Sequence, residues 1–211
     1  MDAILHSLLQ YLISLPAIII GLTFHEYAHG RMAYYLGDKT AYYAGRLTLN
    51  PLPHLDPVGF LMLMFFHFGW AKPVPVNPNA FTRIQSRKTG MLLVALAGPL
   101  MNFVLATAAM LLLRILSPVL YGEVGNTLLQ LILPLITVNL VLAIFNLIPI
   151  PPLDGSKILA GILPDSAYGV MNSIERYGAL FLLIFVLSDA ANAILGPAVS
   201  AVYSFLYRLI F

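Results

Sequence analysis

One stretch of this chain, GMLLVALAGPLMNFVLATAAMLLL at residues 90–113, runs for 24 positions without a charged side chain. A helix of about 20 apolar residues is long enough to cross the hydrocarbon core of a bilayer. The rest of the chain is similarly apolar, since 60% of its 211 residues are hydrophobic and only 9% are charged. A soluble domain carries about 25% charged residues. The sequence therefore predicts an integral membrane protein.

Further apolar stretches predict an all-α polytopic fold with about four to six transmembrane or re-entrant segments. Residues 8–24 and 128–148 each predict a span, whereas the 12 residues of 59–70 are short enough to re-enter on the same side. The tail from residue 177 contains one long or two short apolar segments, because SDAANA interrupts it. Residues 42–49, YYAGRLTL, are rich in aromatic and β-branched side chains and predict a short membrane-associated strand or hairpin.

We expect one domain over residues 1–211, with its core at 8–163 and C-terminal helical segments at 174–211. There is no cysteine, which excludes disulfides and thiolate ligands. The net charge of +2 is small and argues against a nucleic-acid partner. The lipid bilayer is the partner that the composition predicts, and the sequence does not indicate an oligomeric state.

Positive charges are concentrated between residues 30 and 90, which hold seven of the eleven Lys and Arg residues. The first 30 residues and the loop at 117–126 hold none. Loops rich in Lys and Arg face the cytoplasm. If 59–70 re-enters, all seven charges lie on one side; if it spans, they split three and four and do not decide the orientation. We expect the first arrangement, a multi-pass protein of the cell membrane with its N-terminus outside.

The first apolar stretch runs into the motif HEYAH at residues 25–29. On a helix, His25 and His29 project from the same face one turn apart, so their imidazoles can bind one metal ion. Zinc accepts nitrogen ligands, and a catalytic zinc keeps one position for water. In H-E-x-x-H sites the glutamate, here Glu26, is the general base for that water. The alternative is a chance match on an ordinary helix, but ionisable groups inside a membrane are costly and mark functional sites.

A catalytic zinc usually has three protein ligands, so two histidines leave the site incomplete. Asp154 stands out because it follows a span and the proline-rich sequence PIPP. Irregular backbone at membrane depth is tolerated only where it is buried in protein or lines a polar cavity. The alternative role for Asp154 is as the N-cap of a following helix. The other candidate ligands are His6, His54, His67, Asp38, Asp56, Asp165 and Glu175.

These motifs together resemble the site-2 protease family of intramembrane zinc metalloproteases. The resemblance rests on HEYAH, on NLIPIPPLDG about 125 residues later, and on LAGPLMN between them. GRLTLNPLPHLDPVG and GWAKPVPVNP are similar to the compact bacterial and archaeal members. Some members carry an inserted PDZ domain or a C-terminal CBS pair, for which this chain has no room. The resemblance covers most of residues 20–160.

The resemblance implies that His25, His29 and Asp154 bind zinc and that Glu26 is the general base. It also implies that Asn146 donates a hydrogen bond to the oxyanion of the scissile carbonyl; the alternative is an interhelical hydrogen bond.

The motifs do not define the roles of two further residues, Asn102 and His54. Asn102 matches a G-x-x-x-N motif that begins at Gly98, and its plain interpretation is a hydrogen bond across a close helix contact. His54 is a partner of a ligand, a group on the substrate side, or a residue that holds its own loop. With three ligands assigned, direct ligation by His54 would close the site to water.

The expected function is that of an intramembrane zinc endopeptidase. It would hydrolyse transmembrane or juxtamembrane segments of membrane-protein substrates with a zinc-activated water, from a site toward the cytoplasmic side. The strand at 42–49 would pair with the unwound substrate. The alternative is a non-catalytic zinc-binding chaperone or transporter on the same scaffold, which would not need Glu26. A soluble-type zincin tethered to the membrane does not fit, because the motif lies within an apolar span.

Overall fold

The computed structural model describes the backbone of residues 2–66 and 69–211, and the side chains of residues 12–65, 69–167, 169 and 173–211. The helices of this described part are α1 (Asp2–Tyr35), α2 (Thr40–Tyr43), α3 (Pro57–Phe66), α4 (Arg87–Leu116), α5 (Gly122–Asn146), α6 (Asp154–Ile162), α7 (Tyr168–Arg176), α8 (Gly178–Leu187) and α9 (Asp189–Ile210). Short 3-10 turns are η1 (Leu52–His54), η2 (Pro78–Ala80), η3 (Ser117–Val119) and η4 (Asp165–Ala167). Most of the residues that the structure describes are therefore helical.

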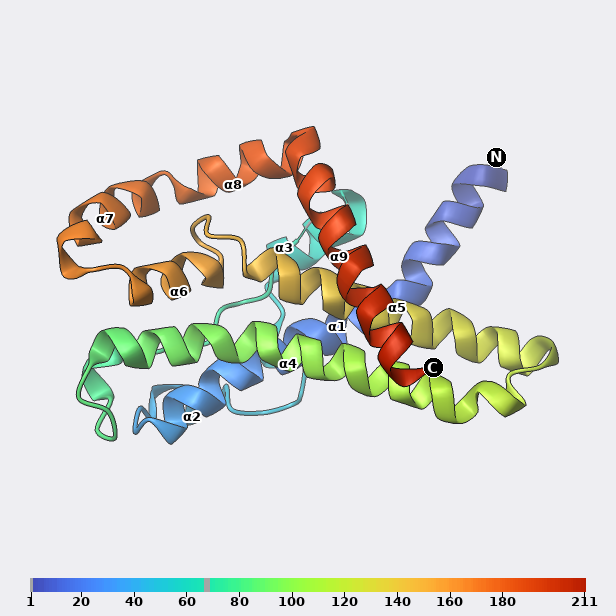
Figure 1. Ribbon diagram of the computed structural model, residues 1–211, viewed down its shortest axis with the longest axis horizontal. Helices are drawn as coiled ribbons and strands as arrows, with labels where there is room; N and C mark the ends of the chain where they lie inside the picture. Colours follow the sequence, from blue (N-terminus) through green and yellow to red (C-terminus); the bar gives the residue numbers. More distant parts are fainter. Residues whose placement is uncertain (1, 67–68) are drawn as a thin grey trace.

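Helix α4 connects the other long helices of the molecule. It packs against α1, α5 and α6 and also contacts α9. Figure 1 shows α5 running back beside α4 while α9 crosses the pair. Among the described residues, three helices are long and apolar enough to cross a membrane: α4 continued through η3, α5 and α9. The protein is accordingly a helical membrane protein.

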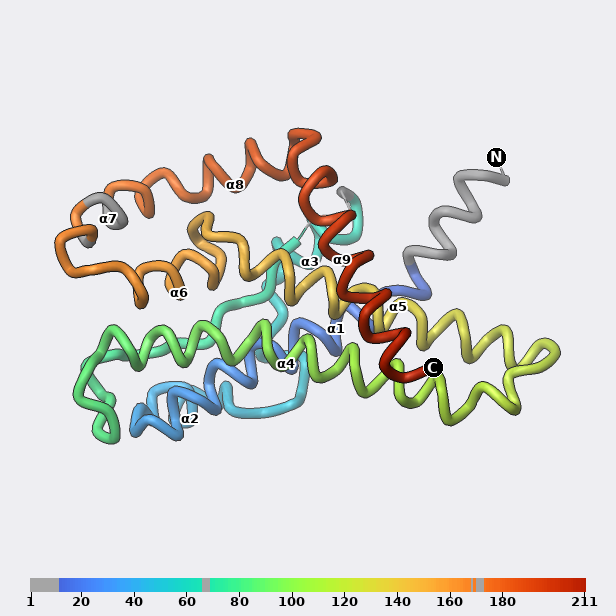
Figure 2. The backbone as a smooth tube through the Cα atoms, in the orientation of Figure 1, coloured from blue at the N-terminus to red at the C-terminus, as the bar shows by residue number. Residues whose placement is uncertain are grey.

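Helices α7 and α8 form an arm outside this bundle. Their main contacts are with η4, with each other and with α9. The backbone trace in Figure 2 leaves α6, follows this arm outward and returns to the bundle through α9. The tail that the sequence left undecided is thus two helices, and the break between α8 and α9 falls at Ser188, which is extended.

A buried apolar cluster joins α4, α5 and α9. Its members are Ala106, Ala109, Met110, Leu113, Ile132, Ile136, Leu140 and Leu206. Within a membrane, helices associate through van der Waals packing, and small residues allow their backbones to approach closely. The alanines of α4 play this part here, and Met110 and Ile136 fill the space between the helices with no exposed surface.

The ends of the central helices follow from local chemistry. The Thr89 N–H at the start of α4 donates to the Ser86 side chain at 3.2 Å, which satisfies one free donor of the first turn. Helix α5 ends at Asn146 because Pro149, Pro151 and Pro152 cannot continue a regular helix. The turn between α5 and α6 brings Asp154 back against α1.

The short strand or hairpin predicted at residues 42–49 is not formed. Residues 40–43 are the helical turn α2, and the chain continues through a turn and bends. The Asp38 carboxylate favours this turn because it accepts hydrogen bonds from both the backbone N–H and the hydroxyl of Thr40. A strand also needs a neighbour to pair with, and the described part of the chain contains only one isolated β-bridge, between Leu55 and Ala71.

The short apolar stretch at 59–70 overlaps helix α3, which runs from Pro57 to Phe66. Its 10 residues rise about 15 Å, roughly half of the hydrocarbon thickness of a bilayer. This length fits the predicted re-entrant segment better than a full span. Residues 67 and 68 of the stretch lie outside the described residues.

Candidate metal centre

Two histidines of α1 and one aspartate of α6 meet in the interior of the bundle. The Nε2 atoms of His25 and His29 lie 3.0 Å apart. The Oδ2 atom of Asp154 lies 3.1 Å from the first and 3.0 Å from the second. All three residues are buried, and they form the one cluster of potential metal ligands found among the described residues. The structure thus brings together the three residues that the motifs single out.

The hydrogen bonds on the far side of each imidazole test whether a metal fits. The Nδ1–H of His25 donates to Asn102 Oδ1 at 2.6 Å, and the Nδ1–H of His29 donates to the Val94 carbonyl at 2.7 Å. In the neutral form each Nε2 atom then carries a lone pair, and both lone pairs face the Asp154 carboxylate. Three such acceptors need a cation between them. A tetrahedral zinc holds nitrogen and oxygen ligands roughly 3.3 Å apart, close to the spacing here.

One face of α4 supports the two histidines. Val94, Gly98 and Asn102 follow each other at four-residue intervals, so they form one stripe along the helix. A Cβ atom on Gly98 would lie 2.5 Å from His29 Nε2 and 2.6 Å from His25 Cε1. Glycine therefore lets α4 approach closely enough for Val94 and Asn102 to accept the two imidazole N–H groups.

Asp154 is not the N-cap of α6. Leu153 occupies the N-cap position, and the carboxylate of Asp154 turns toward α1 instead. Its second oxygen, Oδ1, faces Lys157 Nζ at 3.5 Å. A Cβ atom on Gly155 would lie 2.3 Å from the Leu147 carbonyl oxygen. The glycine therefore allows α6 to start tightly against the end of α5, which places Asp154 at the site.

Glu26 faces the same cavity as the three clustered residues without joining them. The cavity has a volume of about 350 Å³, and its lining includes Glu26, Pro73 and Val74. The backbone N–H of Val74 donates to Glu26 Oε2 at 2.8 Å. This bond holds the carboxylate beside the cluster and leaves its other oxygen for a further partner.

The remaining motif residues divide into two groups. Asn102 is fully buried and contacts His25, and Asn146 lines the metal-site cavity while donating one N–H to the Leu142 carbonyl at 3.0 Å. His54 lies elsewhere. It is buried in its own loop, where its Nε2–H donates to the Thr48 carbonyl at 2.8 Å.

The competing ligands named from the sequence have other surroundings. Asp38 accepts the Asn77 N–H at 2.7 Å, in addition to its bonds with Thr40. Asp56 accepts the Gly59 N–H at 2.8 Å near the start of α3, and Asp165 pairs with Lys88 at 2.8 Å. None of these three belongs to the metal-ligating cluster. The side chains of His6 and His67 lie outside the described residues.

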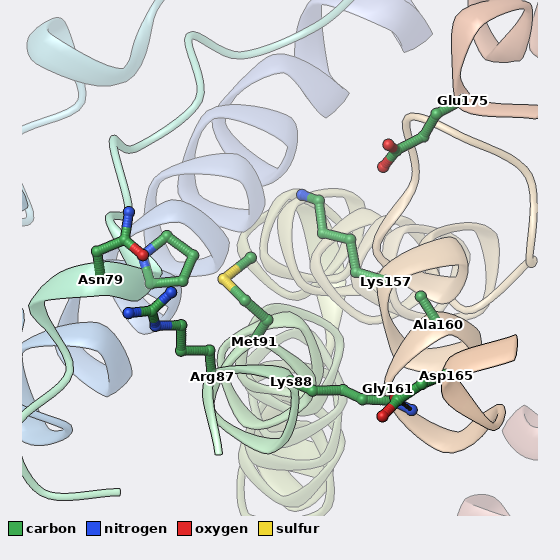
Figure 3. Close-up of a pocket in the computed structure, with 10 residues that line it drawn as sticks. Asn79, Arg87, Lys88, Met91, Lys157, Ala160, Gly161, Asp165 and Glu175 are labelled. Carbon is green, nitrogen blue, oxygen red and sulfur yellow. Dashed lines mark hydrogen bonds and ion pairs between the residues drawn. The ribbon is translucent and has the colours of Figure 1, made fainter. Parts of the chain in front are cut away.

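A second cavity, with a volume of about 680 Å³, adjoins the first. Met91 of α4 and Lys157 of α6 line both cavities. Figure 3 shows these two side chains projecting into the space between α4 and α6, with Glu175 of α7 across from Lys157. Lys88 and Asp165 meet in the lower right part of this view. The second cavity is therefore lined by side chains of both charges and shares two lining residues with the metal-site cavity.

Comparison with known proteins decides the family. The chain is 38% identical over 200 residues to "Putative zinc metalloprotease YwhC" of Bacillus subtilis, which covers 92% of this chain and 88% of that protein. The model of one protein family, Peptidase family M50, matches residues 117–188, a stretch that includes Asp154. The chain belongs to this family. The match confirms the resemblance to the site-2 proteases.

Two further relatives carry the same kind of name. "Putative zinc metalloprotease Rip2" of Mycobacterium tuberculosis is 29% identical over 82% of this chain and 66% of its own length. "Putative zinc metalloprotease MJ0611" of Methanocaldococcus jannaschii is 32% identical over 72% of each chain. No solved structure matches this M50 chain.

Three features of the site were not predicted from the sequence. Asn139 of α5 accepts a hydrogen bond from Asn102 at 2.8 Å. It belongs to no motif, although a polar side chain inside an apolar span could have marked it. Lys157 follows Asp154 by three residues, one turn along α6. The Val74 N–H is a backbone group, so no side-chain pattern could have indicated its contact with Glu26.

Proposed function

We propose that this M50 peptidase is a zinc endopeptidase that hydrolyses transmembrane or juxtamembrane segments of other membrane proteins. The observation that carries the proposal is the buried cluster of His25, His29 and Asp154, with ligand atoms 3.0–3.1 Å apart and Glu26 on the same cavity wall. A purely structural metal site would not need the glutamate. The apolar helices that surround the cluster would hold it within the membrane.

In this proposal each residue of the cavity has a separate task. His25, His29 and Asp154 hold the zinc ion, which when bound supplies a Lewis acid that polarises the scissile carbonyl and lowers the pKa of water. Glu26 takes the proton from the attacking water and delivers it to the leaving amine. Asn146 has a second amide N–H beyond the one bonded to Leu142, and this N–H would donate to the developing oxyanion.

Hydrolysis at membrane depth requires a path for water. The second cavity supports such a path, because it shares Met91 and Lys157 with the metal-site cavity and has charged side chains along its wall. In the proposed orientation this cavity opens toward the cytoplasm. The polar segment next to the cleaved bond of a substrate would leave through the same cavity, whose lining residues Figure 3 shows.

Substitution of Glu26 by glutamine tests the chemistry. Glu26→Gln keeps the shape and the hydrogen bond to Val74 but removes the base, so cleavage should fall by about 10²–10⁴-fold while zinc stays bound. Metal content and cleavage of co-expressed single-span proteins are measured on the same preparation. Full zinc content with cleavage at the wild-type rate would remove Glu26 from the mechanism.

The orientation in the membrane can be tested with single cysteines, since the chain has none of its own. Gln85 lies in the positively charged region and Tyr121 in the loop between α4 and α5, and both are exposed. We expect an impermeant thiol reagent added to intact cells to label Tyr121→Cys and to spare Gln85→Cys. The opposite labelling pattern would reverse the proposed topology.

A further inference from the structure

Asn102 connects helices α1, α4 and α5, because protein groups take up the hydrogen bonds of its side-chain amide. Its side chain has no exposed surface. Its Nδ2 group donates to the Gly21 carbonyl of α1 at 3.0 Å and to Asn139 Oδ1 of α5 at 2.8 Å. A backbone carbonyl can only accept, so the amide end of Asn102 must face Gly21. Its oxygen then faces His25 and can only accept the Nδ1–H.

Asn139 extends this argument by one residue. It too has no exposed surface, and its Nδ2 group donates to the Leu135 carbonyl of its own helix at 2.8 Å. That bond turns the oxygen of Asn139 toward Asn102. The hydrogen bonds therefore run in one direction, from His25 through Asn102, with both amides fixed by backbone carbonyls. Reversing either amide would place two donors or two acceptors against each other.

We propose that Asn139 is a positioning residue for the metal centre, acting through Asn102 to hold His25 with its proton on Nδ1 and its Nε2 lone pair toward the metal. The inference rests on the proposed function, because it takes His25 as a ligand. Groups that orient a ligating histidine contribute 10–100-fold to metal affinity. Asn139 is one residue further from the metal, so we expect a contribution of about tenfold, near the low end of that range.

The local packing allows hydrogen bonding to be separated from shape. A Cβ atom on Gly21 would lie 3.0 Å from Asn139 Oδ1, so α1 and α5 are in close contact here. Leucine has the same number of side-chain heavy atoms and the same branching as asparagine and is favoured in an apolar span, so Asn139→Leu removes the hydrogen bonds and keeps the branched shape, with bulkier ends. Asn139→Asp is the rescue variant. Burial away from a cation favours the neutral form of a carboxyl group, so the new C=O can accept from Asn102 while the O–H donates to Leu135.

The experiment measures cobalt(II) binding by the full-length protein in detergent. Affinity is obtained by competition with a chromophoric chelator, and the ligand-field absorption of the bound ion reports its coordination. Asn139→Leu should weaken binding about tenfold and alter the absorption spectrum, and Asn139→Asp should restore both. The matched control is Thr137→Val, which removes another bond from an α5 side chain to the helix backbone, Thr137 Oγ1 to the Leu133 carbonyl at 3.0 Å, at an exposed position. The control should bind cobalt like the wild type.

A double-mutant cycle tests whether Asn139 acts through Asn102. The pair Asn102→Leu and Asn139→Leu should bind cobalt no more weakly than Asn102→Leu alone, since the first change already breaks the connection. Additive losses, or wild-type affinity and spectrum in Asn139→Leu, would overturn the proposal. If Asn139→Leu does not fold, Asn139→Ala should show the same loss. Cobalt binding that survives His25→Ala would instead refute the metal centre itself.

Discussion

The two ends of the α4–α5 pair are built from different kinds of contact. At the metal end, α4 presents Val94, Gly98 and Asn102 to the histidines of α1, and hydrogen bonds of 2.6–3.0 Å connect these helices with α5. At the other end, Ala106 and Met110 of α4 pack in an apolar cluster that has no polar member. The same helix thus contains a region of directional bonds and a region of shape packing.

The two kinds of contact have different effects: hydrogen bonds orient the side chains, and apolar packing holds the helices together. A hydrogen bond fixes which atom of an imidazole or amide points where, and a buried group that loses its partner carries a penalty of about 1–3 kcal/mol. Apolar packing holds the helices together but does not distinguish one proton position from another. We therefore expect changes at the metal end to alter metal binding, and changes at the apolar end to alter stability alone.

Among changes at the metal end, loss of the Asp154 carboxylate should have the largest effect on zinc affinity. Asp154→Ala leaves only His25 and His29, so zinc affinity should fall by more than about 100-fold and cleavage should stop. Asp154→Asn keeps the shape with a weaker donor and should fall between this variant and the wild type. Zinc affinity is measured by chelator competition on purified protein.

Asp56→Ala is the control for Asp154, because Asp56 caps the start of α3. Its loss should cost about 0.5–2 kcal/mol of stability with zinc still bound. Full zinc occupancy in Asp154→Ala together with loss of zinc in Asp56→Ala would move the site to the other loop.

The second largest effect on zinc affinity should come from adding one methyl group at Gly98. Gly98→Ala would place a carbon 2.5 Å from His29 Nε2, so α4 or the histidines must move and the bonds to Val94 and Asn102 must lengthen. Zinc affinity should fall by about 10–100-fold, the range for groups that orient ligands. Gly196→Ala on α9 is the control, since no atom lies within 4 Å of its Cβ position, and its zinc affinity should stay at the wild-type value. Equal zinc affinities in the wild type, Gly98→Ala and Gly196→Ala would show that metal binding does not require the close contact between α4 and the histidines.

At the apolar end the effect should be on stability. Met110→Ala empties a fully buried position between α4 and α5 and should lower the unfolding free energy by about 2 kcal/mol, the low end of the range for such truncations. Zinc affinity should not change. The two quantities are measured by denaturant unfolding in detergent and by chelator competition. A weaker zinc affinity in Met110→Ala would show that the two ends are coupled.

Much of this architecture could be predicted from the sequence because the membrane imposes simple rules. The span expected at 90–113 lies within α4 and that at 128–148 largely within α5, since length and apolarity decide both. His25 and His29 were paired by helix periodicity, and Asp154 by its proline-rich setting. The expected strand at 42–49 failed because β-propensity does not supply a partner strand, whereas the Asp38 side chain does supply a helical turn. The contact of Asn139 could not be predicted, because it depends on how α4 packs against α5 and places Asn102 beside it.

The smallest effect should come from a polar contact at the metal end that is not buried. Lys88 of α4 pairs with Asp165, whose side chain is 92% exposed, and this pairing holds the pKa of the Asp165 carboxyl below its usual range. The folded-state pKa is thus depressed, so any stabilisation is present above the ordinary aspartate pKa and is lost as pH falls through the lower folded value. Exposed ion pairs contribute little because water and salt screen them.

Asp165→Asn should therefore bind zinc like the wild type and shift the unfolding midpoint only slightly at pH 7. The remaining shift should shrink in high salt and disappear in acid, where both proteins carry a neutral group at this position. Thermal unfolding across a pH series, at low and high salt, measures these differences. Weaker zinc binding in Asp165→Asn would contradict the comparison, because polarity at this end of α4 would then affect the metal without burial. Unchanged binding is the result that the comparison predicts, because Val94 and Asn102 act on the metal through their hydrogen bonds to the imidazoles.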